Sequence, residues 1–74
     1  MGDGSFHVGD RVLISAGPFA AMPGTIISAT EVATRWPDQL PQADVDRGVA
    51  CWVCVRIYGR EVPVVVPATD LTIA

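Results

Sequence analysis

The chain of 74 residues contains no lysine, one histidine and two cysteines, and its five arginines are outnumbered by eight acidic residues. The net charge of −3 opposes the phosphate backbone of nucleic acid, so the composition disfavours a protein whose main ligand is DNA or RNA. No apolar run approaches the roughly 20 residues of a membrane-spanning helix. Because the acidic start also lacks the apolar core of a secretion signal, we expect a cytoplasmic protein.

Recognisable catalytic and metal-binding arrangements are missing as well. His7 is the only histidine, and no serine stands in a motif that supplies the base and orienting group of a nucleophile. Cys51 and Cys54 form a Cys-x-x-Cys pair, but within a predicted strand residues three apart point to opposite faces. Such thiolates cannot share one zinc ion, and no second pair completes four ligands. We expect no enzyme, metal or cofactor, with Cys51 facing inward and Cys54 outward.

Half of the residues are apolar, and eleven valines against three leucines favour sheet over helix. Strands this short, joined by turns, predict an all-β domain, a small closed barrel of five strands. We expect residues 1–7 to be a flexible tail and residues 8–74 to form the single barrel domain. The predicted strands are residues 11–16, 24–30, 49–58, a fourth strand through Val62, Val64 and Val66, and 71–73 after a 3₁₀ turn at 67–70.

Alternation along the third and fourth strands predicts an unusually apolar outer face. The inner face would carry Val49, Cys51, Val53, Val55 and Ile57, and the outer face Trp52, Cys54, Arg56, Tyr58 and, on the fourth strand, Val65. Either the long loop 32–48 covers this face with Trp36, or another chain does. Trp36, Trp52 and Val65 are therefore a possible secondary surface, and we expect a monomer rather than a homodimer.

Two turns carry the most specific motifs. The first contains Gly17-Pro18-Phe19-Ala20 with Gly24 four residues further on, and the second contains Tyr58-Gly59-Arg60 followed by Pro63-Val64. Gly24 is expected where two strands approach closely, and Gly59 where a tight hairpin demands a positive φ. Together with Gly9-Asp10 and the alternating valines, these motifs resemble the KOW domain that ends NusG-type transcription factors.

That resemblance implies an SH3-like barrel of the KOW type that acts in transcription elongation or antitermination. In the family the two turns lie side by side and form an apolar patch that docks the termination factor Rho or a small-subunit ribosomal protein. Carried over by matching motif, the partner-binding residues are Phe19, Ile57, Tyr58 and Arg60. Two alternatives stay open: Phe19 plugging the end of the barrel, and Arg60 being a solvated hairpin charge.

The loop 32–48 departs from the family, which usually has a short hairpin there. It carries Asp38, Asp44 and Asp46, but without a calcium-binding pattern these acids are weak evidence for a metal. One helical turn is expected near residues 40–45. Two other functions remain open. The opening Phe-His-Val-Gly-Asp-Arg-Val also resembles the SH3-like β subunit of nitrile hydratase, an accessory chain, and a ribosome-associated KOW protein that contacts RNA is the third possibility.

Overall fold

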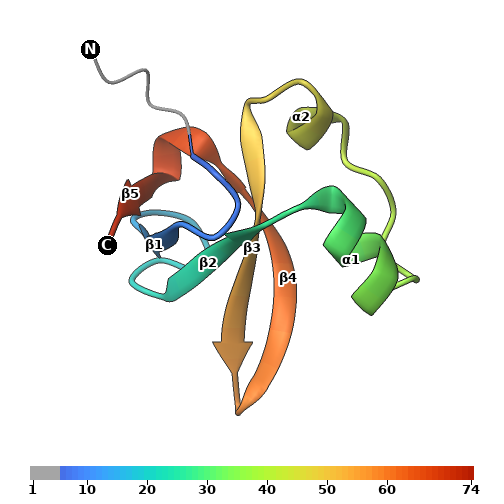
Figure 1. Cartoon of the computed structure of the whole chain (residues 1–74). Coiled ribbons are helices and arrows are strands. Elements are labelled where there is room, and N and C mark those ends of the chain that lie inside the picture. Colours follow the sequence, from blue (N-terminus) through green and yellow to red (C-terminus); the bar gives the residue numbers. More distant parts are fainter. Residues whose placement is uncertain (1–5) are drawn as a thin grey trace.

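A five-stranded antiparallel sheet dominates the computed structural model, which describes residues 6–74 (Figure 1). Its strand order is β4-β3-β2-β1-β5, and the prediction of five strands in a mainly β chain is confirmed. The strands are β1 (Arg11–Ile14), β2 (Pro23–Ile27), β3 (Ala50–Ile57), β4 (Arg60–Pro67) and β5 (Leu71–Ile73). The remaining elements are α1 (Ala29–Arg35), α2 (Ala43–Asp46) and the 3₁₀ helix η1 (Ala68–Asp70).

The sheet is open, whereas the sequence predicted a closed barrel. Among residues 6–74, β3 is the only strand that pairs with β4, and β5 pairs only with β1, so β4 and β5 are the two edges. The chain passes from one edge to the other through η1 alone (Figure 1). Strand β5 has three residues, and all three pair with β1, whereas its other edge pairs with no strand among residues 6–74.

The inner face of the sheet holds the main core. Val12, Ile14, Val53 and Val55 are at most 1% exposed, as the alternation of β1 and β3 predicts. The other buried members are Ile26, Val64, Val66 and Leu71, and Phe6, Phe19, Met22, Cys51, Ile57 and Val62 pack around them. Of the predicted flexible tail, residues 1–7, the structure describes only Phe6 and His7, and residues 1–5 lie outside the described residues. Val49 was expected to face inward, but it precedes β3 and is exposed.

Helix α1 corrects the prediction that the second strand continues to Thr30 and leads into a loop. The strand ends at Ile27, and the hydroxyl of Ser28 accepts a hydrogen bond from the backbone N–H of Glu31 at 3.0 Å. This N-cap begins a helix that ends at Arg35. The loop 32–48 therefore contains the end of α1 and all of α2, a single helical turn that overlaps the turn expected at residues 40–45 but begins at Ala43.

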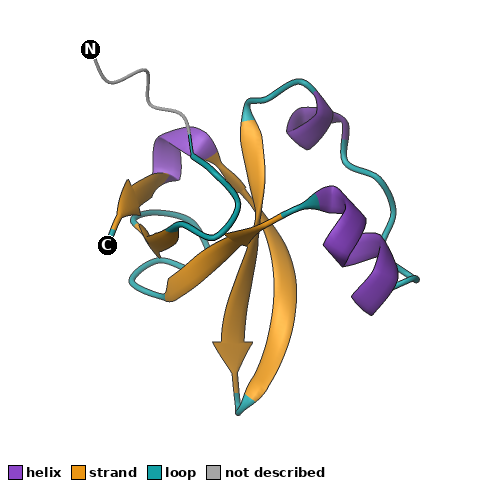
Figure 2. Ribbon diagram, viewed as in Figure 1, coloured by secondary structure: helices purple, strands orange, loops and turns teal. Residues whose placement is uncertain are grey.

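A second core cluster lies on the outer face, between α1 and the sheet. Buried Ile27, Val32 and Trp52 form its centre, and the residues packed against them are Trp36, Val45, Cys54 and Val65. Helices α1 and α2 lie to the right of β3 and β4, away from β1 and β5, whereas the third helical element, η1, lies beside β5 (Figure 1 and Figure 2). Of the two possible covers for this face, the structure shows the chain's own helical segment, with Trp36 part of it. Cys51 and Cys54 pack in different clusters, which confirms that they point to opposite faces.

Candidate functional site

The β3–β4 hairpin ends in a two-residue turn, Tyr58-Gly59, between the paired residues Ile57 and Arg60. Tyr58 has a φ of 52° and Gly59 a φ of 77°, so both central residues are left-handed, as a type I′ turn requires. The Tyr58 side chain is 100% exposed. In Figure 1 the tip extends beyond the rest of the sheet. The hairpin therefore presents an aromatic ring entirely to solvent, and the positive φ predicted for Gly59 is confirmed.

The β1–β2 turn is closed by its own backbone hydrogen bonds. The N–H of Ala21 donates to the carbonyl of Ile14 at 2.7 Å, and the N–H of Met22 donates to that of Phe19 at 3.1 Å. Phe19 is half-buried and packs against the inner core. Of its two predicted roles, the packing role is therefore seen directly, and part of the ring remains accessible.

Strand register places the two turns at the same end of the sheet. Leu13 pairs with Pro23 and Gly24 with Val55, so the start of β2 lies beside the end of β3. The turns nevertheless extend in different directions, the β3–β4 tip downward and the β1–β2 turn to the left in Figure 1. They share one end of the molecule, and the described structure does not show them meeting in one patch.

The other two predicted contact residues differ in exposure. Ile57 is half-buried and packs against the inner core, as Phe19 does. Arg60 is exposed and forms no ion pair within residues 6–74. The predicted set therefore comprises two half-buried residues, Phe19 and Ile57, and two exposed ones, Tyr58 and Arg60.

The predicted secondary surface is largely internal. Trp52 is 4% exposed beneath α1, and Trp36 and Val65 are half-buried in the same cluster. The Arg35 guanidinium lies 4.3 Å from the centre of the Trp36 ring, a cation–π distance. Trp36, Trp52 and Val65 hold α1 to the sheet, and little of their area is left for a partner.

An ion cluster at the edge of α1 was not anticipated from the sequence. Arg35 pairs with Glu31 at 2.9 Å and with Glu61 of β4, and Arg56 lies 3.8 Å from Glu61. The hydrogen bond from Arg35 lowers the pKa of Glu61, and the bonds to Glu61 and Glu31 raise the pKa of Arg35. The spacing of Glu31 and Arg35, four residues apart, was one sequence signal for this helix.

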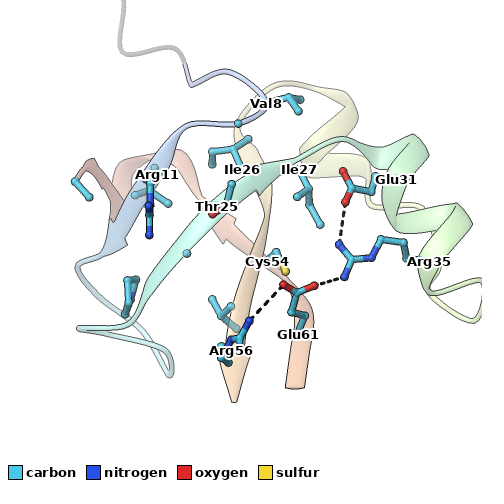
Figure 3. A pocket seen from close by; sticks show the side chains of 16 residues that line it. Val8, Arg11, Thr25, Ile26, Ile27, Glu31, Arg35, Cys54, Arg56 and Glu61 are labelled. Atoms are coloured by element: carbon cyan, nitrogen blue, oxygen red, sulfur yellow. Dashed lines mark hydrogen bonds and ion pairs between the residues drawn. The ribbon is translucent and has the colours of Figure 1, made fainter. Parts of the chain in front are cut away.

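The ion cluster borders an open groove of about 870 Å³ on the outer face of the sheet (Figure 3). Residues of β2 line it together with Cys54 and Val55, and Val8 lies at its upper border, with Arg11 on the side away from α1 (Figure 3). Burial, followed by the neighbouring Glu61 carboxylate, raises the pKa of the Cys54 thiol. Such a shift lowers the thiolate fraction, so Cys54 is not an activated nucleophile.

Metal ligands are not gathered anywhere in residues 6–74: no three His, Cys, Asp or Glu side chains there are placed to hold an ion. Both cysteines in this part of the chain are free thiols, and burial also raises the pKa of Cys51. None of the helices in the same residues has the length and apolarity to cross a bilayer. The chain matches no protein-family model, and no curated protein is significantly similar to it in sequence.

Proposed function

We propose that this chain is a non-catalytic protein-interaction module, an SH3-like domain of the KOW type resembling the end of NusG-type transcription factors. Its partner is a Rho-like termination factor or a small-subunit ribosomal protein, and the contact is made by the β3–β4 tip and the neighbouring rim. Tyr58 and Arg60 supply the solvated part of this contact, and Phe19 and Ile57 supply the apolar rim. The process served is transcription elongation or antitermination.

The exposure of Tyr58 is the observation that carries the proposal. A left-handed backbone costs a residue other than glycine about 1–2 kcal/mol, and asparagine tolerates it better than tyrosine. The Tyr58 ring buries no area within the described chain, so folding gains nothing that offsets this cost. A rigid aromatic side chain on a tight hairpin loses little entropy on association, and tyrosine is enriched among residues that dominate binding.

The arrangement of the strands supports the fold part of the proposal. The strands β1 to β4 form an antiparallel meander, and β5 returns after a 3₁₀ turn to pair with β1. A curled meander whose last strand returns to the first is how a small barrel brings its edges together. Strand β5 follows β4 after only the single turn of η1, and the two strands are the edges that such a barrel would bring together.

The test is calorimetric titration of the purified chain with the purified Rho-like factor and small-subunit ribosomal protein of the source organism. We expect Tyr58→Asn to weaken binding at least tenfold, which corresponds to about 1.4 kcal/mol. Asparagine is favoured at this turn position, so the variant should unfold at an equal or higher urea concentration than the wild type. Phe19→Ala is less informative because Phe19 also packs against the core.

Leu40→Asn is the matched control, because Leu40 is also an exposed apolar residue but lies in the segment between the helices. It should leave the affinity unchanged. The proposal is wrong if neither protein binds the wild type, or if Tyr58→Asn and the wild type bind equally well. Stable association with an enzyme's catalytic subunit instead would favour the accessory-subunit alternative.

A further inference from the structure

The groove on the outer face of the sheet is the part of that face that α1 leaves uncovered. The helix shields Trp52 and Ile27, whereas the surface over β1 and the first half of β2 remains open (Figure 3). Register aligns Arg11 of β1 with Thr25 of β2, and Thr25 with Cys54 of β3. These three residues therefore form one row across three strands, and Arg56 lies two residues beyond Cys54 on the same face.

Positive charge is concentrated in this groove. Three of the five arginines line it, Arg11, Arg35 and Arg56, against two glutamates, Glu31 and Glu61, which gives a net of one positive charge in a chain of net charge −3. The other acidic residues within the described chain lie outside its lining: Asp10, Asp38, Asp44, Asp46 and Asp70.

Two of these arginines have unused hydrogen-bonding capacity. Glu31 and Glu61 both bond to Arg35, so their charge is directed at that guanidinium. Arg56 is 70% exposed and reaches Glu61 only at 3.8 Å, beyond hydrogen-bonding distance. Arg11 is exposed and has no ion-pair partner within residues 6–74. The groove therefore offers two guanidinium groups, with the Thr25 and Cys54 side chains between them (Figure 3).

We propose that the groove binds a short acidic segment of a partner protein in extended form, with Arg11 and Arg56 each pairing with one carboxylate. A planar guanidinium matches a carboxylate with two parallel hydrogen bonds, and extended chains fit a shallow surface across strands. A longer polyphosphate chain would leave the groove and meet the acidic remainder of the molecule, which favours carboxylates over RNA. This surface goes beyond the proposed contact at the hairpin tip.

The experiment is a titration of the ¹⁵N-labelled chain with a capped hexaglutamate peptide, followed by two-dimensional NMR. We expect amide shifts confined to the groove, at Arg11, Thr25, Cys54 and Arg56. The double variant Arg11→Gln/Arg56→Gln should weaken binding about tenfold, as the loss of two exposed charge pairs predicts. A capped hexaglutamine peptide should produce no shifts, and added salt should weaken the binding of hexaglutamate.

Arg47→Gln is the matched control, because it removes the same charge from an exposed arginine outside the groove. It should leave the affinity for hexaglutamate within about twofold. The inference is overturned if hexaglutamate causes no shifts, if Arg47→Gln weakens binding as much as the double variant, or if octauridylate RNA binds the groove more tightly than hexaglutamate. Binding at the hairpin tip is measured with different ligands, so either proposal can fail without the other.

Discussion

Gly24 is the residue at which the sheet has no room for a side chain. A Cβ placed there would lie 2.4 Å from Cγ1 of Val53 and 3.0 Å from the carbonyl oxygen of Cys54. Val53 is fully buried, and a backbone carbonyl in a strand pair cannot withdraw without breaking the pairing of β2 with β3. The sequence-based prediction of a close approach at Gly24 is therefore confirmed, and the cause is steric rather than conformational.

Gly24→Ala should consequently destabilise the chain by about 2–3 kcal/mol, the upper range for overpacking a core. Urea unfolding followed by tryptophan fluorescence measures this change. Gly9→Ala is the control: a Cβ at Gly9 has open space around it, and only its φ of 97° adds a cost, of about 1–2 kcal/mol. Equal destabilisation by the two variants would contradict the steric explanation.

Residue-level predictions succeeded where alternation alone decides the outcome. Val53 and Val55 were assigned to the inner face by their parity, and both are buried. Parity failed for Val49, because alternation holds only inside a paired strand and β3 begins one residue later. For Phe19 the sequence left two roles open, since the orientation of a turn residue depends on the packing around it.

Among the elements, α1 was missed although its start signal was present. Ser28 and Glu31 have the spacing of a capping box, and the N-cap hydrogen bond between them is formed. The neighbouring Ile26 and Ile27 read as a continuing strand, and a seven-residue helix is too short to show a clear helical period. By contrast, β5 was predicted with its observed bounds, because the 3₁₀ turn before it marks its start.

The edge strand β4 shows how an element can be protected by its sequence. Pro63 and Pro67 pair with Cys54 and Ala50, and proline is tolerated in a sheet where its nitrogen faces away from the neighbouring strand. Both nitrogens therefore face the free edge, where they remove donors that another chain would need. This edge is therefore a poor template for strand addition by another chain.

The ion pair between Arg35 of α1 and Glu61 of β4 leads to a prediction about stability and pH. The hydrogen bond from Arg35 lowers the pKa of Glu61, so the ionised carboxylate stabilises the fold above the unfolded-state pKa near 4.5. That stabilisation is lost as the pH falls through the lower folded-state value. Thermal melts should therefore show the wild type to be more stable than Glu61→Gln at pH 6–7, with the difference disappearing by about pH 3.

Asp38→Asn provides the comparison, because Asp38 is exposed and forms no ion pair among the described residues. Its difference from the wild type should change far less over the same pH range. A Glu61→Gln difference that persists at pH 3 would mean that the lost packing of the side chain, rather than its charge, stabilises the contact between α1 and β4.

At the scale of the whole molecule, the features that the sequence did not predict depend on how elements meet. The sheet is open because β4 and β5, the two edge strands, do not pair with each other, and the groove combines Arg11, Arg35 and Arg56 from three separate elements. Sequence motifs within a single turn do not indicate which distant elements pack or pair with each other. Alternation along the strands showed that the outer face is apolar, but it did not show what covers this face. The sequence therefore left two possible covers, the loop 32–48 and another chain.

The burial of Trp52 by α1 leads to a prediction about the association state. Since α1 covers this apolar face, we expect sedimentation to show a monomer at micromolar concentrations.

The substitution Val32→Asp tests this role of α1. Val32 is 3% exposed on the face of α1 that packs against the sheet, so Val32→Asp places an unpaired charge in the outer cluster and should detach α1. The tryptophan emission should shift to the red, and the exposed face should then drive self-association. Ala33→Asp adds the same charge at an exposed position of α1 and should leave both the emission and the monomer unchanged. A Val32→Asp variant with red-shifted emission that remains a monomer would show that α1 is not what keeps this face from a second chain.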